Sequence, residues 1–218
     1  CSSDLSFLER FTLDASGNSS LIFDRTPTTY DAHDDNLWQF DVIYDTQSIP
    51  AANMLVAQVA PNAGCICNTD GGQIFLGDLT GTSPLVEVTT FPAGVSVTGG
   101  VVALHPYLMY FGNDGVIGWS VAGAPTDLTG LGSGSARVAG QKIVRGLALR
   151  GGPGNAPAGL FWSADAVIRA SFVGGQEVFQ FDTISPYSSI LSAASVIEYD
   201  GQYFWLGTDR MLMFNGVV

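Results

Sequence analysis

Charged residues are scarce in this sequence, and basic residues are the scarcest. Charged side chains make up 13% of the 218 positions, and eight Lys and Arg stand against twenty Asp and Glu, which gives a net charge of −12. A protein that wraps DNA or RNA needs basic side chains to neutralise phosphates, so the composition argues against that class. An acidic surface can still line a passage for DNA, because it repels the polymer and prevents sticking.

Residues that carry catalysis or bind metals are also few. The chain has two histidines and no G-x-S-x-G motif, and the glycine-rich GLGSGSARVAG lacks the lysine of a phosphate-binding loop. His33 lies near Asp31, Asp34 and Asp35, but the spacing does not match a calcium loop. Twenty acids leave a glycosidase carboxylate pair open, because separation in space is invisible in a sequence. We expect no enzyme activity, no cofactor and no metal site.

Three cysteines, an odd number, are too few for a disulfide framework. Cys65 and Cys67 are two residues apart and share one face if they lie on a strand, and no CxxC pair occurs. We expect them to be buried small side chains in a reducing compartment. Cys1 is followed by two serines, which is how a mature bacterial lipoprotein begins, so that class stays open.

Long uninterrupted apolar runs and long helical patterns are missing. The two uncharged stretches, 46–69 and 88–113, each contain two prolines, so neither predicts a transmembrane helix. The 27 glycines show no collagen period and are typical of turns. We therefore expect an all-β protein without a membrane partner.

A recurring hairpin pattern is what the sequence does contain. A short apolar run, a turn with Asp and a second apolar run occur around Asp78, Asp114, Asp165 and Asp209. The last three aspartates are 51 and 44 residues apart, a spacing typical of four-stranded propeller blades. Gly and Asp accept the left-handed backbone of tight turns, so Gly207 and Asp209 are predicted turn residues. The pattern predicts a β-propeller-like series of hairpins or blades.

Aromatic residues precede these turns, among them Phe161, Trp162, Phe204 and Trp205. Their recurrence in successive units favours packing between sheets, and a ligand-stacking platform is the alternative.

The chain divides by charge into two expected parts. Residues 1–45 hold nine acids and two bases and are predicted to be an acidic N-terminal β segment, while 46–218 form the propeller-like domain. Stretches 129–141 and 150–160 are rich in Gly, Ser and Pro and are predicted loops. Half of the basic residues lie in or between them, and they are candidates for contact with DNA phosphate or an acidic partner, with a solvated strand face as the alternative: Arg137, Lys142, Arg145 and Arg150.

The C-terminal third resembles a known family. The stretches FWSADAVIRASFVGGQEVFQFDTIS and SVIEYDGQYFWLGTDRMLMFNG are similar to the tail-hub, or packaged-DNA-stabilising, proteins of short-tailed bacteriophages and related head-to-tail connectors. The good match covers 160–216, and NLWQFDVIYD and LHPYLMYFGNDGVIGWS fit the same type more loosely. The matching positions are Phe179, Phe181, Asp182, Ile184, Ser185, Glu198, Asp200, Gly201, Phe204, Trp205, Gly207, Asp209, Phe214 and Gly216.

The resemblance implies a structural protein of the virion, located in the phage tail. It implies a homo-oligomeric ring, expected to be a hexamer, that joins the portal or adaptor to tail fibre or needle proteins and helps to retain packaged DNA. DNA would pass through the channel without sequence-specific binding. About four units are recognisable, so we expect the propeller to be incomplete or completed by another segment. The alternatives are a cell-envelope lipoprotein with a propeller scaffold, suggested by Cys1, and a carbohydrate-binding propeller, suggested by the aromatics and acids.

Overall fold

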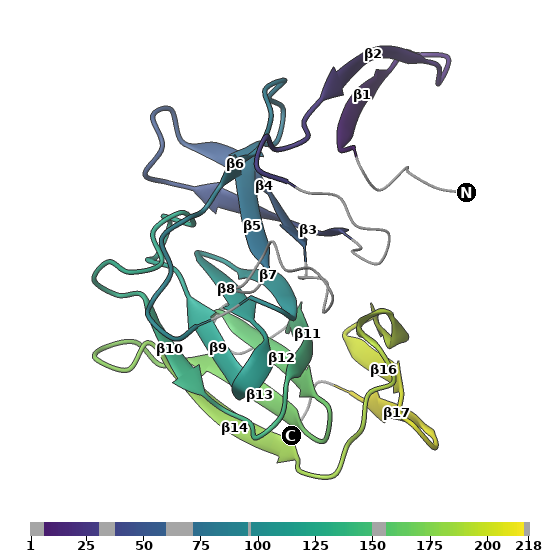
Figure 1. Cartoon of the computed structure of the whole chain (residues 1–218). Helices are drawn as coiled ribbons and strands as arrows, with labels where there is room; N and C mark the ends of the chain where they lie inside the picture. Colours follow the sequence, from purple (N-terminus) through teal and green to yellow (C-terminus); the bar gives the residue numbers. More distant parts are fainter. Residues whose placement is uncertain (1–6, 31–37, 60–71, 96, 150–155, 216–218) are drawn as a thin grey trace.

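Antiparallel β-sheets make up the structure, a computed structural model in which residues 7–30, 38–59, 72–95, 97–149 and 156–215 are described. These residues form five sheets and no α-helix, which confirms the all-β prediction (Figure 1). Short 3-10 turns occur at η2 (Asn113–Gly115) and η4 (Ala193–Ser195).

A two-stranded hairpin begins the described chain. Strands β1 (Glu9–Leu13) and β2 (Ser19–Asp24) pair with each other and project away from the other sheets (Figure 1). The carboxylate of Asp14 accepts hydrogen bonds from the backbone N–H groups of Ser16 and Asn18, and Gly17 adopts a φ of 83°. This turn chemistry is local, because the side chain of Asp satisfies the amides that the reversal leaves free.

Four further sheets follow in chain order, and each is a meander in which consecutive strands pair. Sheet 1 contains β3 (Trp38–Asp45), β4 (Ala52–Val59), β5 (Gln73–Asp78) and β6 (Val86–Glu87). Sheet 2 contains β7 (Gly100–Leu104), β8 (Tyr107–Phe111), β9 (Val116–Trp119) and β10 (Gly134–Arg137). Sheet 3 contains β11 (Ile143–Ala148), β12 (Ala158–Ser163), β13 (Val167–Phe172) and β14 (Phe179–Ser185). Sheet 4 contains β15 (Val196–Tyr199), β16 (Gln202–Leu206) and β17 (Met211–Phe214).

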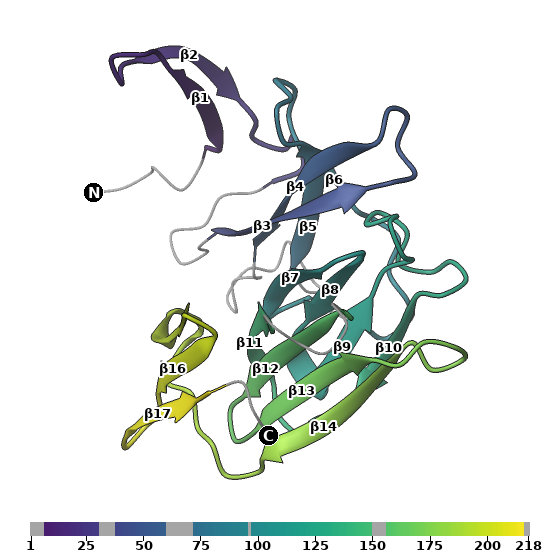
Figure 2. The ribbon, with the colours of Figure 1, turned by 180° about the vertical axis from the view of Figure 1, so that it is seen from behind.

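The sheets pack on one another in the order of the chain. Strand β7 contacts β3 and β4 of sheet 1 on one side and β11 of sheet 3 on the other. The first strands of sheets 1, 2 and 3 are therefore neighbours, and Figure 2 shows the same succession from behind. Sheet 4 packs on sheet 3 through buried side chains of β12 and β16.

Three apolar layers fill the spaces between these sheets. Ile43, Val56 and Tyr110 lie between sheets 1 and 2, whereas Phe111 and Phe161 lie between sheets 2 and 3, with ring centroids 5.5 Å apart and an edge-on geometry. Trp162 and Trp205 lie between sheets 3 and 4 with centroids 5.7 Å apart. Edge-to-face aromatic pairs at such distances stabilise a core beyond the burial of their surface.

A glycine allows sheets 2 and 3 to approach closely. A Cβ on Gly146 of β11 would lie 2.7 Å from Phe161 and 2.8 Å from Phe111, closer than side-chain carbons approach one another. Any larger residue would have to displace one of these rings, so this position requires Gly for packing rather than for backbone freedom.

One predicted division and two predicted loops differ from the structure. The division after residue 45 falls inside sheet 1, because β3 pairs along its whole length with β4. The predicted loop 129–141 contains strand β10, and the predicted loop 150–160 contains the beginning of β12. Strand β10 is held by backbone pairing to β9, and a Cβ on Gly134 would lie 2.6 Å from the Trp119 ring, so small residues are required where composition indicated a loop.

Candidate assembly surface

The turns around Asp114, Asp165 and Asp209 lie between the second and third strands of sheets 2, 3 and 4. Asp114 adopts a left-handed φ of 61°, and the hydroxyl of Ser163 donates to the Asp165 carboxylate over 2.8 Å. The repeated Asp therefore lies at the same place in three successive sheets, whereas Asp78, which the sequence pattern grouped with them, ends β5, the third strand of sheet 1.

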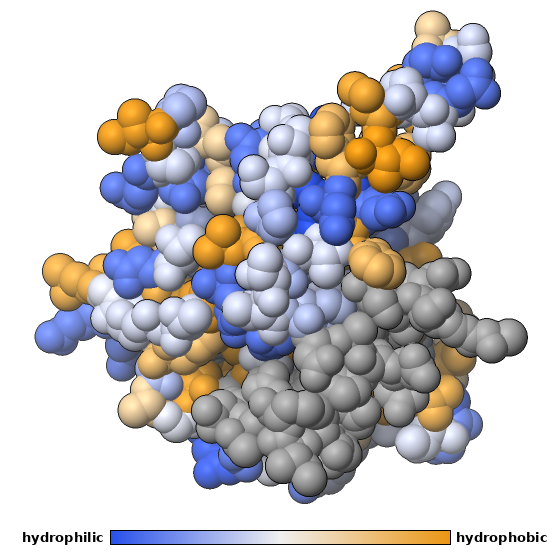
Figure 3. All heavy atoms as spheres, turned by 45° about the horizontal axis from the view of Figure 1, so that its top comes forward, coloured by the Kyte–Doolittle hydropathy of each residue, from blue (hydrophilic) through white to orange (hydrophobic). Residues whose placement is uncertain are grey.

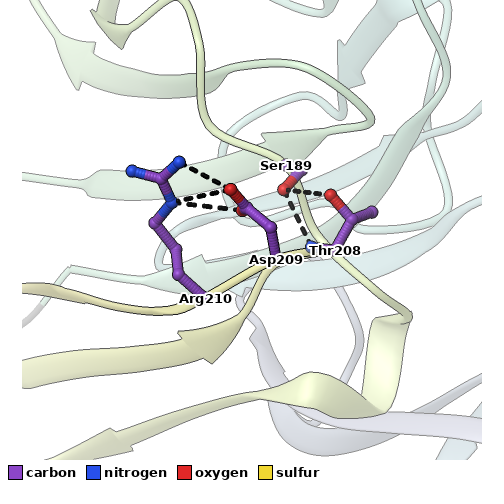
Figure 4. Close-up of polar contacts among 4 residues, drawn as sticks. All are labelled: Ser189, Thr208, Asp209 and Arg210. Carbon is purple, nitrogen blue, oxygen red and sulfur yellow. Dashed lines mark hydrogen bonds and ion pairs between the residues drawn. The ribbon is translucent and has the colours of Figure 1, made fainter.

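The turn of sheet 4 is held by polar contacts that Figure 4 shows. The backbone N–H and the hydroxyl of Thr208 both contact the Ser189 hydroxyl, at 3.0 and 3.2 Å. Gly207 donates its N–H to the Arg210 carbonyl over 2.8 Å, and a Cβ on Gly207 would lie 2.7 Å from the Ser189 hydroxyl. Hydrogen bonds from the Arg210 guanidinium hold the pKa of Asp209 below its usual value. These contacts close a hairpin.

The residues before each turn alternate between the two neighbouring sheets. The fourth residue before the Asp faces the preceding sheet, as Tyr110, Phe161 and Trp205 do. The third residue before the Asp faces the following sheet in sheets 2 and 3, where Phe111 and Trp162 are fully buried. The aromatics in sheets 2 and 3 pack between sheets, as predicted, whereas Phe204 of sheet 4 is only half-buried.

The candidate basic cluster is divided among different contacts. Arg137 donates to the Asp114 carbonyl over 2.8 Å, and its guanidinium lies 3.7 Å from the Asp114 carboxylate, with both side chains largely exposed. Arg145 donates to the Gln39 side chain over 3.3 Å. Desolvation lowers the pKa of the exposed Lys142 and of the half-buried Arg145, and the nearby Asp41 carboxylate opposes the lowering for Arg145. Arg150 lies outside the described residues.

A polar group that the sequence reading missed lies at the free edge of β7. The Asp41 carboxylate accepts the Ala103 N–H over 2.7 Å, and the Gln39 amide donates to the Gly99 carbonyl over 2.9 Å. Among the described strands β7 pairs with β8 alone, so β3 supplies side chains in place of a neighbouring strand. The stretch WQFDVIYD contained the signal, because its residues alternate between polar and apolar. Gln39 and Asp41 lie on the same face of the strand as Ile43, the face toward sheet 2.

The N-terminal hairpin is anchored to sheet 1 by Arg25, which the sequence reading counted only as a charge. Arg25 is 2% exposed, and its guanidinium donates to the carbonyls of Asp78 and Gly81, each over 2.9 Å. Burial and the neighbouring Arg10 lower its pKa, and Asp78 opposes that effect. A pocket beside this anchor lies between the hairpin and sheet 1, and its lining is mostly apolar: Leu8, Glu9, Arg10, Phe11, Arg25, Leu55 and Leu79.

Large apolar side chains are exposed at both ends of the series of sheets. Figure 3 shows hydrophobic residues on the projecting hairpin, where Phe11 and Ile22 are 57% and 62% exposed. Sheet 1 exposes Phe40 and Tyr44, and sheet 4 exposes Met213. Exposed apolar side chains gathered on one sheet mark a surface for association.

No cluster of three or more His, Cys, Asp or Glu side chains suited to a metal occurs among the described residues. The acidic residues around His33 and all three cysteines lie outside the described residues. None of the described segments forms a helix with the length and apolar character needed to span a bilayer.

Comparison with known proteins adds no relative: no protein-family model matches the chain, and no curated protein matches it. The fold and surface therefore define a class, an all-β scaffold of stacked antiparallel sheets with apolar side chains exposed at both ends.

Proposed function

We propose that this chain is a structural virion protein of a bacteriophage tail, a hub or connector component, whose sheets 1 to 4 are consecutive blades of a propeller-like body. The observation that carries the proposal is the succession of meander sheets in which β7 contacts the first strands of the sheets before and after it. Neighbouring first strands are what blades arranged around an axis require. Among the described residues sheet 4 has three strands, and in this proposal the propeller-like body is incomplete or completed by another segment.

The resemblance of 160–216 to tail-hub proteins supports the choice of a phage tail over other propeller proteins. That stretch covers β12 to β17 and supplies the interface between sheets 3 and 4. Its shared residues Trp205, Gly207 and Phe214 are packing or turn residues, so the resemblance concerns architecture. A structural role is consistent with that kind of match.

In the proposed role, copies of the chain form a ring, a hexamer by the resemblance, between the portal or adaptor and the tail fibre or needle proteins. The ring helps to retain packaged DNA. The net charge of −12 suits a passage that DNA crosses without adhering, because like charges repel along the wall. Arg137, Lys142 and Arg145 serve contacts within the protein or with neighbouring subunits in this proposal, and DNA passes through the channel without sequence-specific binding.

The test uses the phage whose genome encodes the chain. Mass spectrometry of purified virions should find the protein, and antibody labelling should place it at the tail by electron microscopy. Phage in which the gene carries an early stop codon should yield filled heads that lose their DNA, and a plasmid copy of the gene should restore infectivity. Absence of the protein from purified virions, or normal particles without the gene, would overturn the proposal.

A further inference from the structure

Sheet 4 has one face that no described residue covers. The cross-strand register places Ile197, Phe204 and Met213 side by side and Leu206 beside Met211. Ile197, Met211 and Met213 are 64%, 67% and 58% exposed, and no charged residue lies on this face. We call this the sheet 4 face; its members are Ile197, Tyr199, Gln202, Phe204, Leu206, Met211 and Met213.

The repeat explains why these side chains are apolar. Counted back from the turn Asp, Phe204 and Leu206 occupy the positions of Met109 and Phe111 in sheet 2. In sheet 3 the same two positions are Leu160 and Trp162, and all four residues in sheets 2 and 3 are 0% exposed. Each of those pairs is covered by the sheet that follows it. Sheet 4 thus carries the packing residues for a following sheet, although Leu206 is 47% exposed.

Sheet 1 has an uncovered face of the opposite kind. Its residue Ile43 is fully buried against sheet 2, and on the other face Phe40, Val42 and Tyr44 are 51%, 36% and 43% exposed. We call these three residues of β3 the sheet 1 face. The N-terminal segment covers the neighbouring part through Leu8 and Tyr30, which pack on Ala57 and Phe75, so the exposure is confined to β3.

Each internal interface joins two unlike faces. The face of one sheet that points forward along the chain packs on the backward face of the next sheet. Among the described sheets 1 to 4, sheet 4 has a bare forward face, and sheet 1 has a backward face that is bare along β3. The backward face of sheet 1 in a second copy can therefore cover the forward face of sheet 4. Apolar side chains would then lie opposite apolar side chains, with no charge to desolvate.

We propose that the sheet 4 face of one copy packs on the sheet 1 face of a second copy. This inference rests on the proposed assembly of copies into a ring and names the surfaces that form it. The contact is head-to-tail, because different patches meet, and repetition closes a ring when the rotation between copies allows it. It continues between copies the stacking that joins sheets 1 to 4 within one copy.

Two double variants of the whole chain test the contact. Leu206→Asp with Met213→Asp places charges on the sheet 4 face, and Phe40→Asp with Val42→Asp places them on the sheet 1 face. The matched control is Leu131→Asp, at a fully exposed apolar residue outside both faces. Near-ultraviolet circular dichroism of the buried tryptophans checks that each variant is folded.

Light scattering over a concentration series should find that the parent chain and the control associate. Each double variant alone should associate roughly a hundredfold more weakly. An equimolar mixture of the two should form dimers with one copy of each and nothing larger, because one intact pair of unlike faces remains. Three results would overturn the proposal: a monomeric parent, association of the sheet 1 variant alone through paired sheet 4 faces, or unchanged association of the sheet 4 variant.

Cross-linking keeps the proposal testable if a charged variant fails to fold. One copy carries Val42→Cys and the other carries Met213→Cys, and a short bismaleimide should join them, while the parent with its own cysteines gives the background. Absence of a product above that background contradicts the contact. These measurements use purified protein and are independent of the virion. If the chain is missing from virions but the cross-link forms, the tail role is refuted and the contact stands. If the chain is found in the tail but the cross-link does not form, the contact is refuted and the tail role stands.

Discussion

Sheets 3 and 4 share a sequence pattern and differ in what covers them. GLFWSAD in sheet 3 and YFWLGTD in sheet 4 both end a strand with aromatics before a turn. Trp162 is fully buried beneath sheet 4, whereas Leu206, three residues before its own turn Asp, is 47% exposed. The pattern therefore specifies a sheet with two apolar faces, and the presence of a next sheet decides whether both faces are buried.

The contrast predicts that an aromatic residue before the turn contributes more to the free energy of unfolding in the covered sheets than in sheet 4. Phe161→Ala removes a fully buried ring that contacts Phe111, and we expect a loss of about 3–5 kcal/mol in the free energy of unfolding. Phe204→Ala in sheet 4 removes a half-buried ring and should cost clearly less in the monomer. Urea unfolding measures both values, and equal losses would contradict the comparison.

The N-terminal hairpin depends on one anchor, in contrast to the broad layers between the sheets. Arg25→Met leaves the carbonyls of Asp78 and Gly81 without their charged donor, and we expect the free energy of unfolding to fall by about 2 kcal/mol. Hydrogen exchange should quicken in β1 and β2 and stay unchanged in sheets 2 and 3. The matched control Arg210→Met breaks an exposed pair with Asp209 and should leave the hairpin protected. Faster exchange throughout the chain would show that the anchor is not local.

The layer between sheets 1 and 2 contains a buried hydroxyl whose removal should stabilise it. Tyr110 is fully buried, and its hydroxyl has no hydrogen-bond partner among the described residues. Tyr110→Phe should raise the free energy of unfolding by up to about 1 kcal/mol at neutral pH, because the desolvation cost disappears. Calorimetry measures the change, and a loss above about 1 kcal/mol would indicate a partner for the hydroxyl.

The same residue should make the covered layer sensitive to alkali. Burial raises the pKa of Tyr110 to about 12, from an ordinary value of 10.0. As the pH rises, the unfolded chain releases the Tyr110 proton before the folded chain does. The free energy of unfolding is therefore unaffected by this titration below pH 10, and it falls as the pH rises from there through the folded pKa. Tyr110→Phe should reduce that alkaline fall in stability relative to the parent. An identical fall in both proteins would show that Tyr110 does not titrate in this way.

Exposed turn residues should matter least in any sheet. Arg137→Met removes the ion pair with Asp114 at 3.7 Å, in which both side chains are largely exposed, and we expect a change within about 0.5 kcal/mol. Thermal unfolding measures it, with Arg169→Met on β13 as a comparison in the covered sheet 3. A larger loss at Arg137 would assign the turn a packing role.

The sequence predicted the features that depend on neighbouring residues. The hairpin turns at Asp114, Asp165 and Asp209 could be found because turn chemistry is local and repeats with the sheets. The anchoring of Arg25 by Asp78 and Gly81, and the contacts of Asp41 and Gln39 with β7, join residues more than fifty positions apart. No local pattern encodes such pairs. Strand β10 was missed because its residues GSAR begin with Gly and Ser, which are typical of loops, although their burial alternates along the strand.

The sequence was sufficient to predict which residues belong to the candidate site, but not which of them are exposed on its surface. Trp205 and Leu206 are consecutive in the sequence, yet one is 5% exposed and the other 47%, because only one face of sheet 4 meets sheet 3. The basic residues were grouped by their spacing in the chain, whereas Arg137 contacts Asp114 and Arg145 contacts Gln39. Which face of a sheet is covered, and which basic residue contacts which partner, depend on how the sheets are stacked. Both can be stated only when the order of the sheets in space is known.

Electron cryomicroscopy of the assembled protein would show directly which surfaces join the copies. We expect Leu206 and Met213 of one copy to lie beneath β3 of the next, against Phe40 and Val42, so that the stacking of sheets continues from copy to copy. A reconstruction in which copies associate while the sheet 4 face remains open to solvent, or is covered by another part of the chain, would contradict it.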